Sequence, residues 1–141
     1  SFRGGRNSRL DELQAAFLNI KLPHLNTENE ARKKIAKRYL SEIKNNKIQL
    51  SICNNINDHV FHLFEIRTES RDTLQEYLFK NEIETVIHYP IPPHKQKALQ
   101  EFNHLSLPIT EKIHQEVLSL PMSSVLTDEE ITHIIANLNS Y

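Results

Sequence analysis

Residues 4–9 are the first place in the chain where side chains suited to binding an anion gather. The segment Gly4-Gly5-Arg6-Asn7-Ser8-Arg9 combines two guanidinium groups, an amide and a hydroxyl just ahead of a predicted helix. Free backbone N–H groups at a helix start attract anions, and adjacent glycines let the backbone approach a ligand closely. The segment therefore fits a phosphate or carboxylate site. It fits equally well a capped helix end whose arginines face water.

A second group of polar side chains lies in the proline-rich segment His88-Tyr89-Pro90-Ile91-Pro92-Pro93-His94. Three prolines exclude a regular helix or strand ladder. We therefore expect an extended loop that loses little entropy on binding, and its two imidazoles and one phenol suit contact with a substrate. One alternative is a stiff crossover whose Tyr89 packs in the core. Another is a metal pair from His88 and His94, for which the sequence offers no third ligand at a recognisable spacing.

The cysteine and the other histidines give weaker indications of a functional site. Cys53 is the one cysteine, so neither an internal disulfide nor a cysteine-based metal site can form. We expect His62 to have a core or hydrogen-bonded role. The histidines expected at the surface are His24, His104, His114 and His133. No nucleophile stands beside a base, so these segments amount to one side of a site that another domain or chain completes.

Hydrophobic periodicity predicts the elements that position these segments. Apolar residues at three- and four-residue steps predict helix from about residue 10 to 43, with Pro23 giving either two helices or one bent helix. The expected helix caps are Ser8 and Thr27. Extended segments are expected at 48–52, 60–66, 84–87 and 120–122. Further helices are expected at 70–79, 96–102, 110–118 and 127–138, the last capped by Thr127.

Composition narrows the class of protein. Strands separated by single helices predict a small α+β sheet covered by helices. The 141 residues, 38% hydrophobic with a net charge of -1, fit one globular domain or part of one. This charge argues against a nucleic-acid partner, and no apolar run is long enough to span a bilayer. Both glycines lie at residues 4 and 5, which excludes glycine-rich nucleotide loops. The scarcity of glycine, together with a first residue other than Met, suggests that the chain is a piece of a larger protein.

Three motifs occur in a fixed order along the chain: GRNSRLDELQAA at residues 5–16, HYPIPPH at 88–94, and LSLPM at 118–122 followed by LTDEEI at 126–131. They resemble the corresponding motifs of the DegT/DnrJ/EryC1/StrS family of pyridoxal-phosphate-dependent sugar aminotransferases. The resemblance covers nearly the whole chain.

The resemblance implies the aspartate-aminotransferase fold (fold type I) and a homodimer with its sites at the subunit interface. It places this chain in the C-terminal portion of such an enzyme. Residues 1–45 would be a motif loop and a long interdomain helix. Residues 46–141 would be the C-terminal small α+β domain, with a short, mainly antiparallel sheet. The large cofactor-binding domain would be missing.

The resemblance also assigns roles to single residues. Asn7 matches the family's asparagine that reaches the phosphate of pyridoxal 5'-phosphate in the neighbouring subunit. The residues that match substrate-binding positions are Arg9, His88, Tyr89 and His94. The lysine that binds the cofactor covalently lies upstream in this family, so no catalytic residue is expected in this chain and we expect the chain alone to be inactive.

The activity implied for the parent is transfer of an amino group from glutamate to a keto-sugar nucleotide, such as a dTDP-3-keto-6-deoxyhexose. This reaction belongs to the biosynthesis of deoxyamino sugars, including those of lipopolysaccharide O-antigen, in the cytoplasm. Two alternatives stay open: a family dehydratase with histidine at the lysine position, and a non-catalytic domain that binds a sugar nucleotide.

Overall fold

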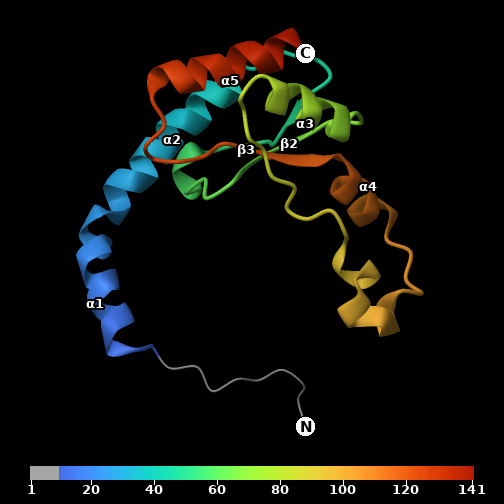
Figure 1. Cartoon of the computed structure of the whole chain (residues 1–141), viewed down its shortest axis with the longest axis horizontal. Helices are drawn as coiled ribbons and strands as arrows, with labels where there is room; N and C mark the ends of the chain where they lie inside the picture. Colours follow the sequence, from blue (N-terminus) through green and yellow to red (C-terminus); the bar gives the residue numbers. More distant parts are fainter. Residues whose placement is uncertain (1–9) are drawn as a thin grey trace.

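A three-stranded antiparallel sheet lies at the centre of the computed structural model, which describes residues 10–141 (Figure 1). The strands are β1 (Gln49–Leu50), β2 (Phe64–Arg67) and β3 (Val117–Leu120), in the order β1-β2-β3. The register pairs Leu50 with Ile66 across the first two strands, and Glu65 with Ser119 across the second two. Helices flank this sheet, so the predicted α+β class with a short antiparallel sheet is confirmed.

The N-terminal helices form one long, bent run. Helix α1 (Glu12–Lys21) continues through a 3₁₀ turn at Leu22–His24 into α2 (Leu25–Glu42). Pro23 lies at the start of the 3₁₀ turn, where a missing N–H is tolerated. Thr27 lies inside α2, so the predicted cap there is wrong: the backbone keeps helical dihedrals from Lys21 to Leu25 and leaves no helix start to cap. The predicted cap at Ser8 lies outside the described residues.

The later helices follow the predicted order more closely. They are α3 (Arg71–Lys80), α4 (Pro108–Glu116) and α5 (Asp128–Ser140), and 3₁₀ turns lie at Ile56–Asp58, Pro93–Lys95 and Lys97–Phe102. Thr127 caps α5 as predicted. Its hydroxyl accepts the N–H of Glu130, and the Glu130 carboxylate accepts the N–H of Thr127. This reciprocal capping box satisfies two N–H groups that the helix leaves unpaired.

The predicted strand at 60–66 starts four residues late. Phe61 has a φ of 49°, which takes the backbone out of the extended region, and β2 begins only at Phe64. His62 lies ahead of the strand and is exposed, so the predicted core role is wrong. The expected strand at 84–87 is reduced to a single bridge between Val86 and Ser119.

Two predicted helices also change. Residues 96–102 form 3₁₀ turns interrupted at Leu99, whose φ of -125° is not helical. Val117 and Leu118, predicted as the end of a helix, belong to β3. Both residues continue the apolar repeat of α4, but β3 is buried along its whole length, so apolar spacing alone could not separate the two elements.

The apolar core lies on one face of the sheet. Phe64 and Ile66 of β2 pack there with Leu118 and Leu120 of β3, against α2, α3 and α5. Side chains of a strand alternate between faces. The neighbouring residues Glu65, Arg67, Val117 and Ser119 must therefore face the other side. That second, more polar face is the one that the proline-rich loop meets.

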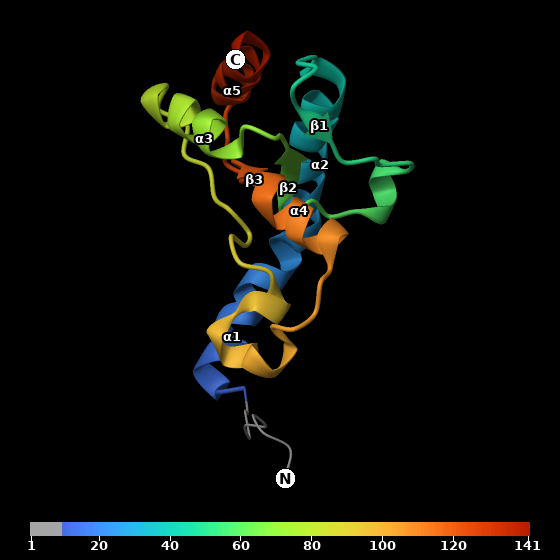
Figure 2. The same ribbon diagram turned by 90° about the vertical axis from the view of Figure 1, so that its right-hand side faces the viewer.

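Two arms extend in the same direction from the body of sheet and helices (Figures 1 and 2). One arm is α1, which has no buried residue. Its exposed apolar side chains, with those of the adjoining turn, are Leu10, Leu13, Phe17, Leu18, Ile20, Leu22 and Leu25. The other arm holds the 3₁₀ turns after Pro92, with exposed Phe102, Leu105, Leu107 and Ile109. Contiguous exposed apolar patches are typical of contact sites. Neither α1 nor any other helix within residues 10–141 is long and apolar enough to cross a membrane.

Candidate functional site

The polar face of the sheet carries a hollow of about 470 Å³, which we call the sheet hollow. Its residues come from β1 and the segment after it, from β2 and β3, and from the loop and α4: Gln49, Leu50, Ser51, Ile52, Glu65, Arg67, His88, Ile113 and Val117. The period of two in β2 puts Glu65 and Arg67 here because Phe64 and Ile66 face the core. The hollow therefore combines a carboxylate, a guanidinium and an imidazole beside apolar side chains.

His88 is the loop residue that lines the sheet hollow, and β3 holds it there. Its Nδ1 lies 2.9 Å from Oγ of Ser119. Two backbone hydrogen bonds between Val86 and Ser119, of 2.8 and 3.2 Å, fix the chain just ahead of it. Among residues 10–141 nothing hydrogen-bonds Nε2 of His88, which is the ring nitrogen left for a ligand.

Tyr89 follows His88 through a cis peptide bond and presents its ring to solvent. The residue is 64% exposed, so the alternative of a crossover with Tyr89 packed in the core does not hold. Its ring stands edge-on to the His88 imidazole, with centroids 5.4 Å apart and planes at 89°. The backbone carbonyl of Tyr89 accepts a hydrogen bond from Nδ1 of His114. An imidazole and a phenol are thus displayed side by side.

His94 is placed differently from the other two loop residues. It is only 6% exposed and does not line the sheet hollow. Its Nε2 lies 2.9 Å from Oε1 of Glu111, which also accepts the N–H of Leu107 at 3.0 Å. The hydrogen bonds from His94 and Leu107 hold the pKa of the Glu111 carboxyl below its ordinary value. Because an ionised carboxylate only accepts, Nε2 of His94 is the donor, and the pair anchors the loop to α4.

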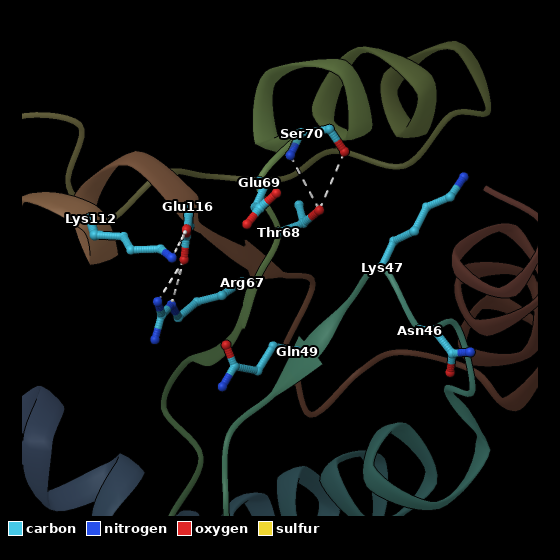
Figure 3. Close-up of a pocket in the computed structure, with 9 residues that line it drawn as sticks. All are labelled: Asn46, Lys47, Gln49, Arg67, Thr68, Glu69, Ser70, Lys112 and Glu116. Carbon is cyan, nitrogen blue, oxygen red and sulfur yellow. Dashed lines mark hydrogen bonds and ion pairs between the residues drawn. The ribbon is translucent and has the colours of Figure 1, made fainter. Parts of the chain in front are cut away.

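A polar cleft of about 510 Å³ adjoins the sheet hollow and shares Gln49 and Arg67 with it (Figure 3). The shortest contact between its described residues joins Arg67 to Glu116, with Nη2 and Nε of the guanidinium 2.6 and 3.1 Å from Oε2. Lys112 lies 3.5 Å from the other oxygen of the same carboxylate. Two cations are therefore already matched to one buried carboxylate, and the cluster ties β2 to the end of α4.

The pKa of Glu116 reflects two opposed effects. Burial of the carboxyl raises its pKa, while the hydrogen bond from Arg67 and the charges of Lys112 and Arg67 lower it. The lowering prevails, so the carboxyl is ionised at neutral pH. Nothing in the sequence pattern indicated this pair, because Arg67 and Glu116 meet only when β2 and β3 pair.

The predicted site residues divide into two groups. Asn7 and Arg9 lie outside the described residues. Of the others, the structure brings His88 and Tyr89 together at the polar face and places His94 under the loop. His114, predicted as a surface residue, contacts the loop, and sequence reasoning missed this role because no short-range pattern links residues 89 and 114.

The described residues hold little that could bind a cofactor or metal. No lysine within residues 10–141 is buried, so none is the desolvated amine that a covalent bond to a carbonyl cofactor favours. Likewise, no three His, Cys, Asp or Glu side chains of this part of the chain gather in a metal-binding group. The polar groups that remain open to a ligand in this part of the chain are those of the sheet hollow and the loop beside it.

Comparison with known proteins gives the relationship of the chain. Residues 3–139 match the model of the DegT/DnrJ/EryC1/StrS aminotransferase family. The chain is 50% identical over 137 residues to a dTDP-3-amino-3,6-dideoxy-alpha-D-galactopyranose transaminase from Aneurinibacillus thermoaerophilus, over 97% of this chain and 38% of that protein. It is 41% identical over 139 residues to the erythromycin biosynthesis sensory transduction protein EryC1 of Saccharopolyspora erythraea, over 96% of this chain and 38% of that protein.

Solved structures of similar fold also come from this group of aminotransferases. The crystal structure of DesV from S. venezuelae in complex with a ketimine intermediate superposes with a TM-score of 0.89 at 39% identity, over 96% of this chain and 38% of that one. The structure of NtdA from Bacillus subtilis with bound cofactor PMP gives a TM-score of 0.84 at 32% identity, over 98% of this chain and 34% of that one. The chain thus spans 38% of the length of the curated relatives named above. Its sequence and its fold together show that it belongs to the DegT/DnrJ/EryC1/StrS aminotransferase family.

Proposed function

We propose that the parent of this chain is a pyridoxal-phosphate-dependent aminotransferase that moves the amino group of glutamate to a keto-sugar nucleotide. The expected substrate class is a dTDP-3-keto-6-deoxyhexose. The observation that supports this most is the 50% identity to a transaminase named for a dTDP-3-amino-3,6-dideoxy sugar. The paired His88 and Tyr89 beside the sheet hollow add a surface suited to a polar sugar ring.

The parent architecture is also a proposal. Residues 1–45 form the motif loop and interdomain helix, and residues 46–141 the C-terminal small domain. A large domain and a second subunit cover the exposed apolar residues of the two arms. Support comes from α1, whose Phe17 is 58% exposed and whose Leu13 is 68% exposed, although both side chains favour burial.

The described residues do not form a pyridoxal phosphate site by themselves, since they offer no buried lysine. When bound, this cofactor supplies an electron sink for the substrate carbanion. The covalent lysine and the groups around the ring are therefore proposed to come from the rest of the parent. From this chain, Asn7 is proposed to contact the cofactor phosphate.

The role proposed for this chain is to bind and orient the sugar. His88 and Tyr89 offer a ring nitrogen and a phenol, both able to hydrogen-bond sugar oxygens. Arg9 and His94 complete the proposed set of substrate-binding residues. His94 lies under the loop, where it is bound to Glu111. The stiff loop limits the entropy lost when the sugar binds.

The test follows the two half-reactions in the full-length parent. Glutamate should convert the bound cofactor to its amino form, seen as loss of its visible absorption, and the keto-sugar nucleotide should restore it. Tyr89→Phe should lower kcat/KM for the sugar and leave the glutamate half-reaction unchanged. Tyr77→Phe, which removes a hydroxyl on α3, is the matched control.

Three results would contradict the proposal. A parent that binds no pyridoxal phosphate would refute the enzyme. Loss of water from the sugar in place of amino transfer would show a dehydratase. Binding of the sugar nucleotide with no turnover would show a non-catalytic binding domain.

A further inference from the structure

The loop that carries His88 and Tyr89 is fixed by side chains of α4. Nδ1 of His114 contacts the carbonyl oxygen of Tyr89, and the carboxylate of Glu111 holds His94 at the other end of the loop. His88 has its own tie to Ser119 of β3. Among residues 10–141, the one hydrogen bond that Tyr89 makes is the one from the His114 imidazole to its carbonyl oxygen.

The loop has few other contacts that could fix Tyr89, so the hydrogen bond from His114 matters for its position. Among residues 10–141 no backbone-to-backbone hydrogen bond holds residues 88–91. Pro90 has no N–H to donate, and the 64% exposed Tyr89 ring has little packing to fix it. The carbonyl of Tyr89 is the polar group of this residue's backbone that a partner holds, through Nδ1 of His114.

The chemistry of His114 suits this task. A carbonyl oxygen can only accept, so Nδ1 of His114 carries the proton that it donates. The last turn of α4 is itself held, because Nη1 of Arg71 donates to the carbonyl of His114 at 2.8 Å. His114 therefore reaches the loop from a helix end that α3 keeps in place.

We propose that His114 is a positioning residue for the sugar half-reaction: by holding the Tyr89 carbonyl it sets the direction of the Tyr89 phenol and the adjacent His88 imidazole. This inference rests on the proposed function, because it assumes that the loop contacts the keto-sugar. It assigns His114 no contact with substrate or cofactor.

Two substitutions of His114 both replace the imidazole by an amide, but only one of them keeps the hydrogen-bond donor to Tyr89. In His114→Asn the amide nitrogen takes the place of Nδ1, so the donor to Tyr89 is kept. In His114→Gln the amide reaches the place of Nε2, so that donor is lost. The matched control is His133→Gln on α5, where the imidazole Nε2 lies 2.9 Å from the carbonyl of Asn81, away from the loop.

The measurement is single-turnover kinetics of each half-reaction in the full-length holoenzyme. His114→Gln should lower kcat/KM for the keto-sugar about fivefold, the factor that one lost hydrogen bond of about 1 kcal/mol carries. The rate with glutamate should stay within about twofold, since that step does not use the loop. His114→Asn should recover most of the loss, and His133→Gln should match the wild type.

The outcomes are distinct. An active wild type with an unaffected His114→Gln variant overturns the positioning role alone. Equal losses in both half-reactions, or equal losses for the Asn and Gln variants, also overturn it, because they indicate general damage to the fold. A wild-type parent without sugar transamination overturns the proposed function, and this inference falls with it.

Discussion

Replacing Arg67 by leucine should lower the free energy of unfolding by about 2 kcal/mol. Glu116 is 8% exposed, and Arg67 donates two hydrogen bonds to it, while its other cation, Lys112, lies at 3.5 Å with a side chain 60% exposed. Breaking an exposed ion pair costs about 0.5 kcal/mol and breaking a buried one about 3–5 kcal/mol. The Arg67 side chain is 31% exposed, which places this pair between the two cases.

The loss should depend on pH, and the pKa of Glu116 sets the direction. Burial raises this pKa, but the Arg67 hydrogen bond and the neighbouring charges bring it below the ordinary value of 4.5. A carboxyl with a lowered folded-state pKa adds stability above its unfolded pKa and loses it as the pH falls through the folded one. Without Arg67 two of the effects that lower this pKa are lost, so the folded-state pKa of Glu116 rises towards that of the unfolded chain. The difference between wild type and variant should therefore shrink below about pH 4.

Urea unfolding followed by far-ultraviolet circular dichroism measures this difference in the 141-residue chain, which has an apolar core of its own. The control is Lys80→Leu, which removes an exposed pair of α3 with Glu76 and should cost less than about 0.5 kcal/mol. The reasoning would be refuted by an Arg67→Leu loss as small as that of the control. A loss that stays constant on acidification would refute it equally.

The remaining predictions concern the core, a helix cap and the cofactor. Leu138→Ala should cost about 2–5 kcal/mol in urea unfolding, because Leu138 is 0% exposed in the core and the smaller side chain leaves a cavity. Thr127→Ala should cost about 1 kcal/mol by the same assay through loss of the α5 capping box, and no loss would argue against the cap. Asn7→Ala in the full-length parent should weaken retention of pyridoxal phosphate during dialysis, measured by absorbance, while Asn54→Ala should not; equal retention would count against the phosphate contact.

The fold could be predicted from the sequence where local chemistry determines it. Thr127 and Glu130 cap α5 as a local motif does, and the apolar repeat that follows gives the helix. The strands were harder because their limits depend on tertiary pairing. The positive φ of Phe61 interrupts an apolar run that looks continuous, and Leu118 belongs to β3 only because β2 lies beside it.

The site divides in the same way. Motif and composition pointed to His88 and Tyr89, and the structure sets them side by side on the polar face of the sheet. The groups that hold them were not predictable. His114 comes from 25 residues further along the chain and meets Tyr89 only after α4 packs beside the loop. The hydrogen bond of His94 likewise requires Glu111, whose position at the start of α4 gives no sign of a histidine partner.

The central claim is that the parent transfers an amino group to a keto-sugar nucleotide. Glutamate labelled with the heavy nitrogen isotope at its amino group, the full-length parent and a dTDP-3-keto-6-deoxyhexose test it in one mixture, with the sugar product analysed by mass spectrometry. The account predicts an amino sugar nucleotide that carries the heavy nitrogen. A sugar product without nitrogen at the former keto carbon, from a parent that holds its cofactor, would contradict it.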